Sequence, residues 1–170
     1  MESKEILKQL VDMSHKLGEE WRQLVILGEG NTSARASDET FFVKASGTQL
    51  GTITEKGFVE VRFQRVLDMF ECEALSDEEI KHWLKTAMVD PESEFLPSIE
   101  TLFYAYLLSL PGVNFVGHTH PVSVNSILCS KGWYDFTQGR LFPDEIVCCG
   151  IAPAYVEYVD PGVPLARRIR

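Results

Sequence analysis

Residues 97–121 read PSIETLFYAYLLSLPGVNFVGHTHP, and this stretch decides the expected fold. Residues 98–110 are mostly apolar and long enough to predict a helix. Pro111 and Gly112 form a pair typical of turns. The apolar residues 113–116 predict a buried strand, which Pro121 ends. The stretch therefore predicts a helix, a tight turn and a returning strand.

The two ends of this unit are expected to meet. The helix runs ~16–18 Å forward and the strand returns roughly 20 Å. Residues two apart on a strand project from one face, so His118 and His120 direct two imidazoles at one point beside Glu100. This convergence predicts a metal site. Two structural alternatives stay open: the helix dipole alone favours an acid at position 100, and the histidines suit a half-exposed strand end.

Composition limits the classes of partner. The 170 residues carry a net charge of −9, with 45% hydrophobic and 24% charged residues, as in one globular domain. An acidic chain is a poor match for nucleic acid or anionic membranes, and no apolar stretch approaches the roughly 20 residues of a membrane span. The four cysteines form no CxxC pair and residues 1–5 do not resemble a signal peptide, so we expect reduced thiols and a cytoplasmic protein.

The remaining elements predict a layered α/β or α+β domain spanning residues 1–170 without an internal boundary. Ser76 and Glu79 form a capping-box pattern at the start of one helix. Expected helices cover residues 3–21, 66–70, 77–89, 122–129 and a final one opening at 162–165. Expected strands, besides 113–116, cover residues 24–27, 41–43, 58–61, 146–149 and 154–158.

Two glycine-containing turns are candidate anion sites. Residues 28–33 (GEGNTS) and the turn at Ser46 and Gly47 combine exposed backbone N–H groups with hydroxyl or amide donors. Ser98 adds a hydroxyl at a helix start. The structural alternatives are a β-turn for each glycine segment and an N-cap for Ser98. Lys44 is either structural or a partner for a charged substrate.

Four motifs in this order resemble the class II aldolase/adducin family. They are Gly30-Asn31-Thr32-Ser33, Lys44-Ala45-Ser46-Gly47, Pro97-Ser98-Ile99-Glu100 and Gly117-His118-Thr119-His120-Pro121. The resemblance covers roughly residues 5–168. It implies a three-layer α/β/α sandwich with a mostly antiparallel central sheet, and a homotetramer with active sites between subunits.

The resemblance also implies a site. A divalent metal, most often zinc, would be held by three histidines, two of which match His118 and His120. Glu100 would be the catalytic acid/base. The substrate-binding residues would be Gly30, Asn31, Ser46, Gly47 and Ser98, the last four at the phosphate end. The implied activity is metal-dependent aldol cleavage of a sugar phosphate, an aldehyde-lyase reaction through a metal-stabilised enediolate.

The chain departs from the family pattern in three respects. No histidine follows His120, so the sequence supplies two imidazoles, with Glu100 or water to complete the metal shell. Ile99 and Gly28 replace hydroxyl residues that are frequent in the family. The chain stops at Arg170 inside the expected last helix, so we expect a domain shortened at its C-terminus and inactive in this form. Alternatives on the same fold are an epimerase, a dehydratase, a decarboxylase or an adducin-like interaction module without catalysis.

Overall fold

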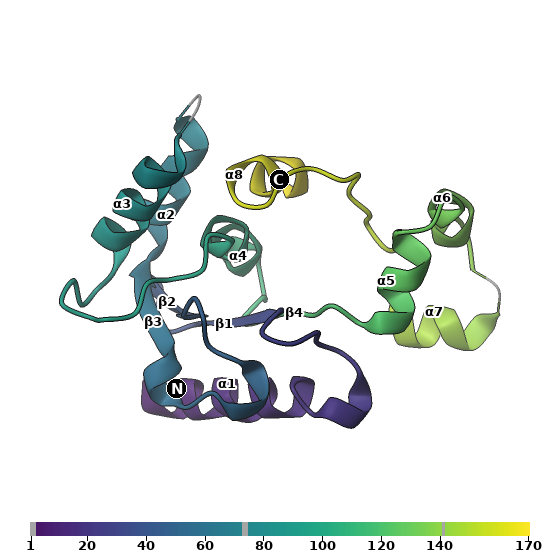
Figure 1. Cartoon of the computed structure of the whole chain (residues 1–170), viewed down its shortest axis with the longest axis horizontal. Helices are drawn as coiled ribbons and strands as arrows, with labels where there is room; N and C mark the ends of the chain where they lie inside the picture. The colour runs from purple at the N-terminus through teal and green to yellow at the C-terminus, as the bar shows by residue number, and fades with distance from the viewer. Residues whose placement is uncertain (1–2, 73–74, 141) are drawn as a thin grey trace.

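A four-stranded antiparallel sheet in the order β3-β2-β1-β4 organises the protein (Figure 1). The computed structural model describes residues 3–72, 75–140 and 142–170. The strands are β1 (Asn31–Arg35), β2 (Thr40–Lys44), β3 (Phe58–Arg62) and β4 (Phe115–His118). The α-helices are α1 (Ser3–Leu17), α2 (Phe63–Leu67), α3 (Asp77–Ala87), α4 (Thr101–Ser109), α5 (Val122–Leu128), α6 (Trp133–Thr137), α7 (Pro143–Cys149) and α8 (Val163–Ile169). Four 3-10 segments cover Glu20–Arg22, Leu50–Thr52, Glu55–Gly57 and Asp68–Glu71.

The side-chain alternation of β2 explains why the sheet is covered on both faces. Phe41 and Val43 point into a large core with α2, α3, α4 and α8, whereas Phe42 points into a smaller core with α1. Helix α1 covers that second face with Ile6 and Leu10. Figure 1 shows α1 on one side of the sheet and α4 and α8 on the other. The expected three-layer arrangement around an antiparallel sheet is confirmed.

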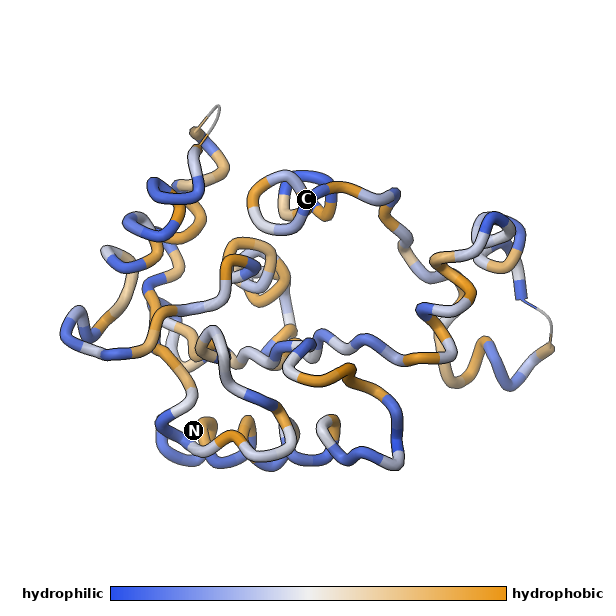
Figure 2. Tube along the Cα trace, viewed as in Figure 1, coloured by the Kyte–Doolittle hydropathy of each residue, from blue (hydrophilic) through white to orange (hydrophobic). Residues whose placement is uncertain are grey.

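Helix α4 lies at the centre of the larger core. Its sequence is apolar on every side, which is typical of a helix buried all round (Figure 2). Leu102, Tyr104 and Leu108 are almost completely buried, and α8 packs against the helix from outside. Helix and returning strand form as predicted, with the helix beginning at Thr101 and the strand at Phe115. Among the described residues, no helix has the length and apolarity needed to cross a membrane.

The first strand differs from the prediction. Residues 24–27 are not a strand, because Gln23 and Leu27 adopt positive φ angles and the Glu29 N–H donates to the Ile26 carbonyl. The strand is instead Asn31–Arg35, which begins inside the segment 28–33 expected as a turn. The strand pairs with β2 on one side and β4 on the other, and its polar residues Asn31, Thr32 and Ser33 are buried between the helices that cover the two faces of the sheet.

The predictions of strands at residues 146–149 and 154–158 are also wrong. Residues 146–149 belong to helix α7, because Pro143 stands in its first turn, followed by Asp144 and Glu145. Residues 154–158 have no regular secondary structure and pair with no strand in the described part of the chain. Helix α6 was not predicted. Figure 1 shows α5, α6 and α7 as an arm that stands apart from the sheet, and none of their described residues is buried.

The other elements differ from prediction mainly at their ends. Helix α1 stops at Leu17, ahead of Gly18, and α3 stops at Ala87, ahead of Met88, which forms a bridge with Val61. The capping box of Ser76 and Glu79 is present. The strands expected at 41–43 and 58–61, the helix expected at 122–129 and the final helix also form, with small shifts of their bounds. The helix expected at 66–70 is divided between α2 and the 3-10 segment Asp68–Glu71.

Candidate active site

The pairing of β1 with β4 brings Asn31 and His118 together. These residues are Cα partners at one end of the sheet, so their side chains leave the same face, toward α4. Gly30 precedes them with φ +88°, and a Cβ there would lie 2.9 Å from the His118 carbonyl oxygen. Glycine at position 30 therefore allows the turn to pass closely over the strand end.

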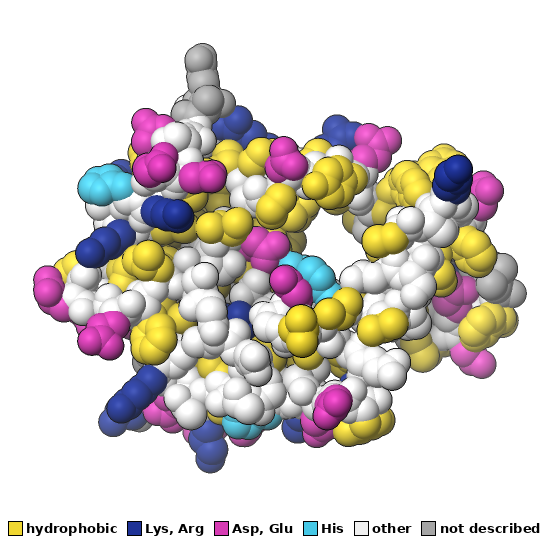
Figure 3. Space-filling view, in the orientation of Figure 1, with side chains coloured by type: hydrophobic (Ala, Val, Ile, Leu, Met, Phe, Trp, Pro, Cys, Tyr) yellow, Lys and Arg dark blue, Asp and Glu magenta, His cyan; other side chains and the backbone are white. Residues whose placement is uncertain are grey.

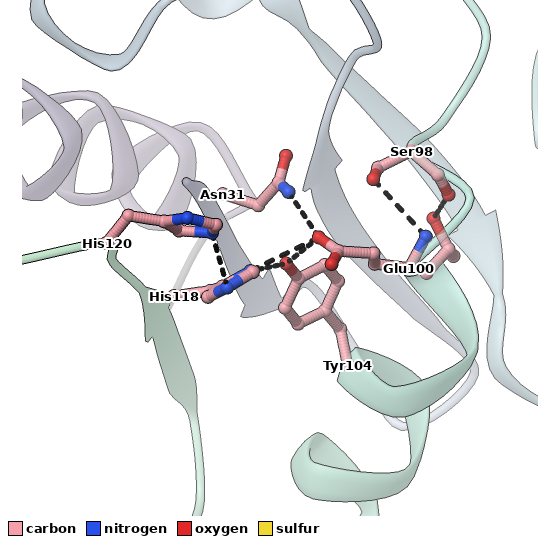
Figure 4. Close-up of polar contacts among 7 residues, drawn as sticks. Asn31, Ser98, Glu100, Tyr104, His118 and His120 are labelled. Atoms are coloured by element: carbon pink, nitrogen blue, oxygen red, sulfur yellow. Dashed lines mark hydrogen bonds and ion pairs between the residues drawn. The ribbon is translucent and has the colours of Figure 1, made fainter. Parts of the chain in front are cut away.

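Glu100 approaches Asn31 and His118 from the start of helix α4. It is the N-cap residue of α4, although its side chain does not cap the helix. Ser98, the alternative N-cap, lies two residues too early; its Oγ accepts from the Glu100 N–H and its carbonyl accepts from the Thr101 N–H. This turn directs the Glu100 carboxylate away from the helix end and toward Asn31 and His118 (Figure 4).

Three side chains meet at one oxygen of Glu100. Its Oε2 lies 2.7 Å from Asn31 Nδ2, 3.1 Å from Tyr104 Oη and 3.2 Å from His118 Nδ1. In the described part of the chain, every hydrogen bond to this carboxylate ends on Oε2. The other oxygen, Oε1, has no hydrogen bond among the described residues.

The two imidazoles of the HxH motif lie together. His118 Nε2 and His120 Nε2 are 3.0 Å apart, and the ring centroids are 4.7 Å apart. The ring of Phe103 packs edge-on against His118. His120 lies beyond the end of β4, and its backbone N–H donates to the Leu24 carbonyl, which fixes the position of His120. The His118 side chain is 24% exposed, and Figure 3 shows a histidine beside acidic side chains at an opening between the core and the arm.

The environment keeps Glu100 ionised and Tyr104 protonated. Burial of the Glu100 carboxyl acts to raise its pKa, but His118, Tyr104 and Asn31 together outweigh this effect, so the pKa lies below the usual value. Burial, with the charge of Glu100, raises the pKa of Tyr104 far above its usual value. Near neutral pH the carboxylate is therefore a proton acceptor and the phenol a hydrogen-bond donor.

The histidine pair fits two positions of a metal shell, and the described residues supply no third. Two nitrogens bound to one tetrahedral zinc at ~2.0–2.1 Å are ~3.3 Å apart, close to the observed 3.0 Å. Glu100 does not complete the set, because it contacts Nδ1 of His118 while His120 faces Nε2. Within residues 3–72, 75–140 and 142–170, no group of three His, Cys, Asp or Glu side chains is arranged around one point.

The second glycine turn expected to bind an anion adjoins the segment that leads to Glu100. The Ser46 N–H donates to the Leu96 carbonyl, and Ala45 bridges Pro97, so the exposed turn at Ser46 and Gly47 lies beside the segment carrying Ser98. Gly47 has φ +82° and open space around it. Lys44 is 3% exposed, and burial lowers its pKa despite the nearby charges of Glu29 and Glu100.

Sequence reasoning missed Tyr104. Its phenol is 2.8 Å from His118 Nδ1 and donates to Glu100 Oε2, so it connects the two predicted functional groups. The available signal was its spacing: Tyr104 lies four residues after Glu100, which places both on one side of a helix. In the sequence alone it was one of several aromatic residues in an apolar helix.

The sequence and the architecture place the chain in a known class. The chain belongs to the class II aldolase and adducin N-terminal domain family, which it matches over residues 8–169. The uncharacterized oxidoreductase YuxG of Bacillus subtilis (strain 168) is 29% identical over 171 residues, covering 96% of this chain. The chain spans 23% of the length of that relative.

Solved structures share the fold. The N-terminal class II aldolase domain of a conserved protein from Thermoplasma acidophilum matches 94% of this chain and 71% of its own, with 29% identity and a TM-score of 0.67. L-fuculose-1-phosphate aldolase from Thermus thermophilus matches 84% of this chain and 58% of its own, with 16% identity and a TM-score of 0.52. The second likeness concerns the fold alone.

Proposed function

We propose that this chain carries the catalytic residues of a metal-dependent aldolase that cleaves a sugar phosphate. The observation that carries the proposal is the convergence of an ionised Glu100 with the paired imidazoles of His118 and His120 at one end of the sheet. A base beside a cation site is what deprotonation and carbon–carbon cleavage next to a carbonyl require. Family membership supports an aldolase-like enzyme in general.

In this proposal the histidines bind the cofactor. His118 and His120 would hold a divalent ion, most simply zinc, through their Nε2 atoms. Such an ion supplies a Lewis acid for the negative charge that develops on substrate oxygen atoms. A third ligand would come from outside the described residues or from water. The proposed homotetramer offers one source, and the arm, with Phe136 and Val147 exposed, offers apolar surface for such an assembly.

Glu100 would move the proton. Its Oε2 is fixed by Asn31 and Tyr104, so Oε1 would face the substrate and accept or return a proton. The fixed orientation costs no reorganisation during the reaction. The lowered pKa favours the base role in the resting enzyme.

The anionic end of the substrate would bind beside this cluster. The exposed turn offers the Gly47 N–H and the Ser46 hydroxyl, because the Ser46 N–H already donates to Leu96, and Ser98 offers a second hydroxyl. Gly30 would let the backbone approach, and the second amide hydrogen of Asn31 would point to the same region. We propose that the enzyme acts in the cytoplasm, consistent with its acidic composition and four free thiols.

The experiment measures aldehyde release and metal content of protein purified without chelator. L-fuculose 1-phosphate and related ketose 1-phosphates are the first substrates, and product analysis separates cleavage from epimerisation, dehydration or decarboxylation. Glu100→Gln is expected to lower kcat by roughly 10²–10⁴-fold while the metal stays bound. His118→Ala is expected to lose the metal, whereas His82→Ala, on exposed α3, is the matched control. Normal activity in metal-free protein or in Glu100→Gln would refute the proposal, and a metal-free, inert protein would favour an adducin-like interaction role.

A further inference from the structure

In the proposed reaction Tyr104 helps to orient Glu100, but its contact with His118 has no role there. It comes from α4, one turn after Glu100, and its side chain is completely buried. Its hydroxyl bonds Glu100 Oε2 at 3.1 Å and His118 Nδ1 at 2.8 Å, and the Asn31 side chain also interacts with it (Figure 4). A hydroxyl has one proton to donate and lone pairs that accept. The two contacts therefore cannot both be donations from Tyr104.

The choice of acceptor decides the state of His118. A carboxylate is the stronger acceptor, because a hydrogen bond to an ionised group is roughly twice as strong as a neutral one. Tyr104 therefore donates to Glu100, and its oxygen accepts the proton carried by His118 Nδ1. Since neutral imidazole carries one N–H, a proton on Nδ1 leaves the lone pair on Nε2.

The lone pair then points to the proposed metal position. His118 Nε2 is the nitrogen that faces His120 Nε2 at 3.0 Å. We propose that Tyr104 is a positioning residue that holds His118 in the Nδ1–H tautomer, so that Nε2 is ready to bind a divalent cation. This inference rests on the proposed metal site. It assigns Tyr104 no contact with substrate and no proton transfer in the reaction.

The geometry also shows why Glu100 alone is a weaker holder of His118. The Nδ1 to Oε2 distance is 3.2 Å, longer than the 2.8 Å to Tyr104, and Asn31 already donates to that oxygen at 2.7 Å. Removing the phenol oxygen leaves His118 with the longer contact. Because a group behind a metal-binding histidine typically contributes 10–100-fold to metal affinity, the loss should be measurable.

The test compares wild-type protein with Tyr104→Phe, which keeps the buried ring and removes the hydroxyl. Tyr106→Phe is the matched control, because Tyr106 lies on the same helix and its hydroxyl bonds a backbone carbonyl at the exposed surface. Zinc affinity is measured by competition with a chromophoric chelator. The tautomer of His118 is measured in metal-free, ¹⁵N-histidine-labelled protein from its ring nitrogen shifts. Thermal midpoints check that each variant is folded.

We expect Tyr104→Phe to bind zinc roughly 10–100-fold more weakly than wild type and to show a mixture of His118 tautomers. Tyr106→Phe should match wild type in both measurements. Unchanged ring shifts in folded Tyr104→Phe, or Nε2–H as the wild-type tautomer, would overturn the inference. If wild type binds no zinc, the proposed metal site fails, and the ring shifts still decide whether Tyr104 sets the tautomer.

Discussion

The hydroxyl pair of Ser14 and Thr32 is expected to be a strong and asymmetric link between α1 and the sheet. Both side chains are completely buried, and their oxygens are 2.7 Å apart. Ser14 also donates to the Leu10 carbonyl at 2.7 Å. Because Ser14 has one proton, Thr32 must be the donor between the two hydroxyls.

This direction fixes the order of the mutational effects. Ser14→Ala leaves the Thr32 donor buried without a partner, which is expected to cost about 1–3 kcal/mol of unfolding free energy. Thr32→Val removes that donor, while Ser14 keeps its bond to Leu10, so the cost is expected to be about 1 kcal/mol or less. In the double variant no donor is orphaned. The two single costs should therefore exceed the cost of the double variant by about 1–2 kcal/mol.

Urea unfolding of the four proteins in the cycle measures these differences. A chain of this size is expected to lose about 2–4 °C of thermal midpoint per kcal/mol, which gives an independent check. Ser126→Ala is the matched control, because Ser126 makes the same bond to the carbonyl four residues earlier but is exposed and has no second hydroxyl partner among the described residues. Strict additivity in the cycle, or a Ser14→Ala cost equal to that of Ser126→Ala, would refute the reasoning.

Three further predictions concern the core, the site turn and the buried lysine. Leu10→Ala should cost about 2–5 kcal/mol in urea unfolding, because Leu10 is completely buried under the sheet. Gly30→Ala should be more destabilising than Gly139→Ala. Both positions have positive φ, but only at Gly30 would the new Cβ meet a backbone oxygen, that of His118. Equal losses of unfolding free energy in the two variants would contradict this prediction. Lys44→Met should be more stable than wild type at neutral pH. Burial lowers the folded-state pKa of Lys44, so the unfolded state binds more protons than the folded state just below pH 10.5. The free energy of unfolding of the wild type therefore rises with pH in that range. Denaturation curves measured at increasing pH toward 10.5 should show the stability advantage of Lys44→Met shrinking.

The sequence predicted elements whose signals are local. The unit of α4 and β4 was predictable because its helix, turn and strand lie within residues 97–121. Strand β1 was not, because Asn31–Arg35 is largely polar and is a strand through pairing with two partners remote in sequence. Residues 146–149 are a helix although their four-residue apolar run fits a strand equally well, and the signal that favours the helix is its Pro-Asp-Glu start at residues 143–145.

In the candidate site, too, the sequence predicted what depends on element lengths but not what depends on side-chain orientation. Glu100, His118 and His120 were expected to converge from element lengths alone, and the structure brings them together. Which ring nitrogen of His118 meets which partner depends on side-chain rotamers, which spacing does not determine. The sequence left Glu100 or water to complete the metal shell, and in the structure the carboxylate meets Nδ1 of His118 whereas His120 faces Nε2. That same oxygen also accepts hydrogen bonds from Tyr104 and Asn31, which leaves Oε1 of Glu100 without a hydrogen bond among the described residues.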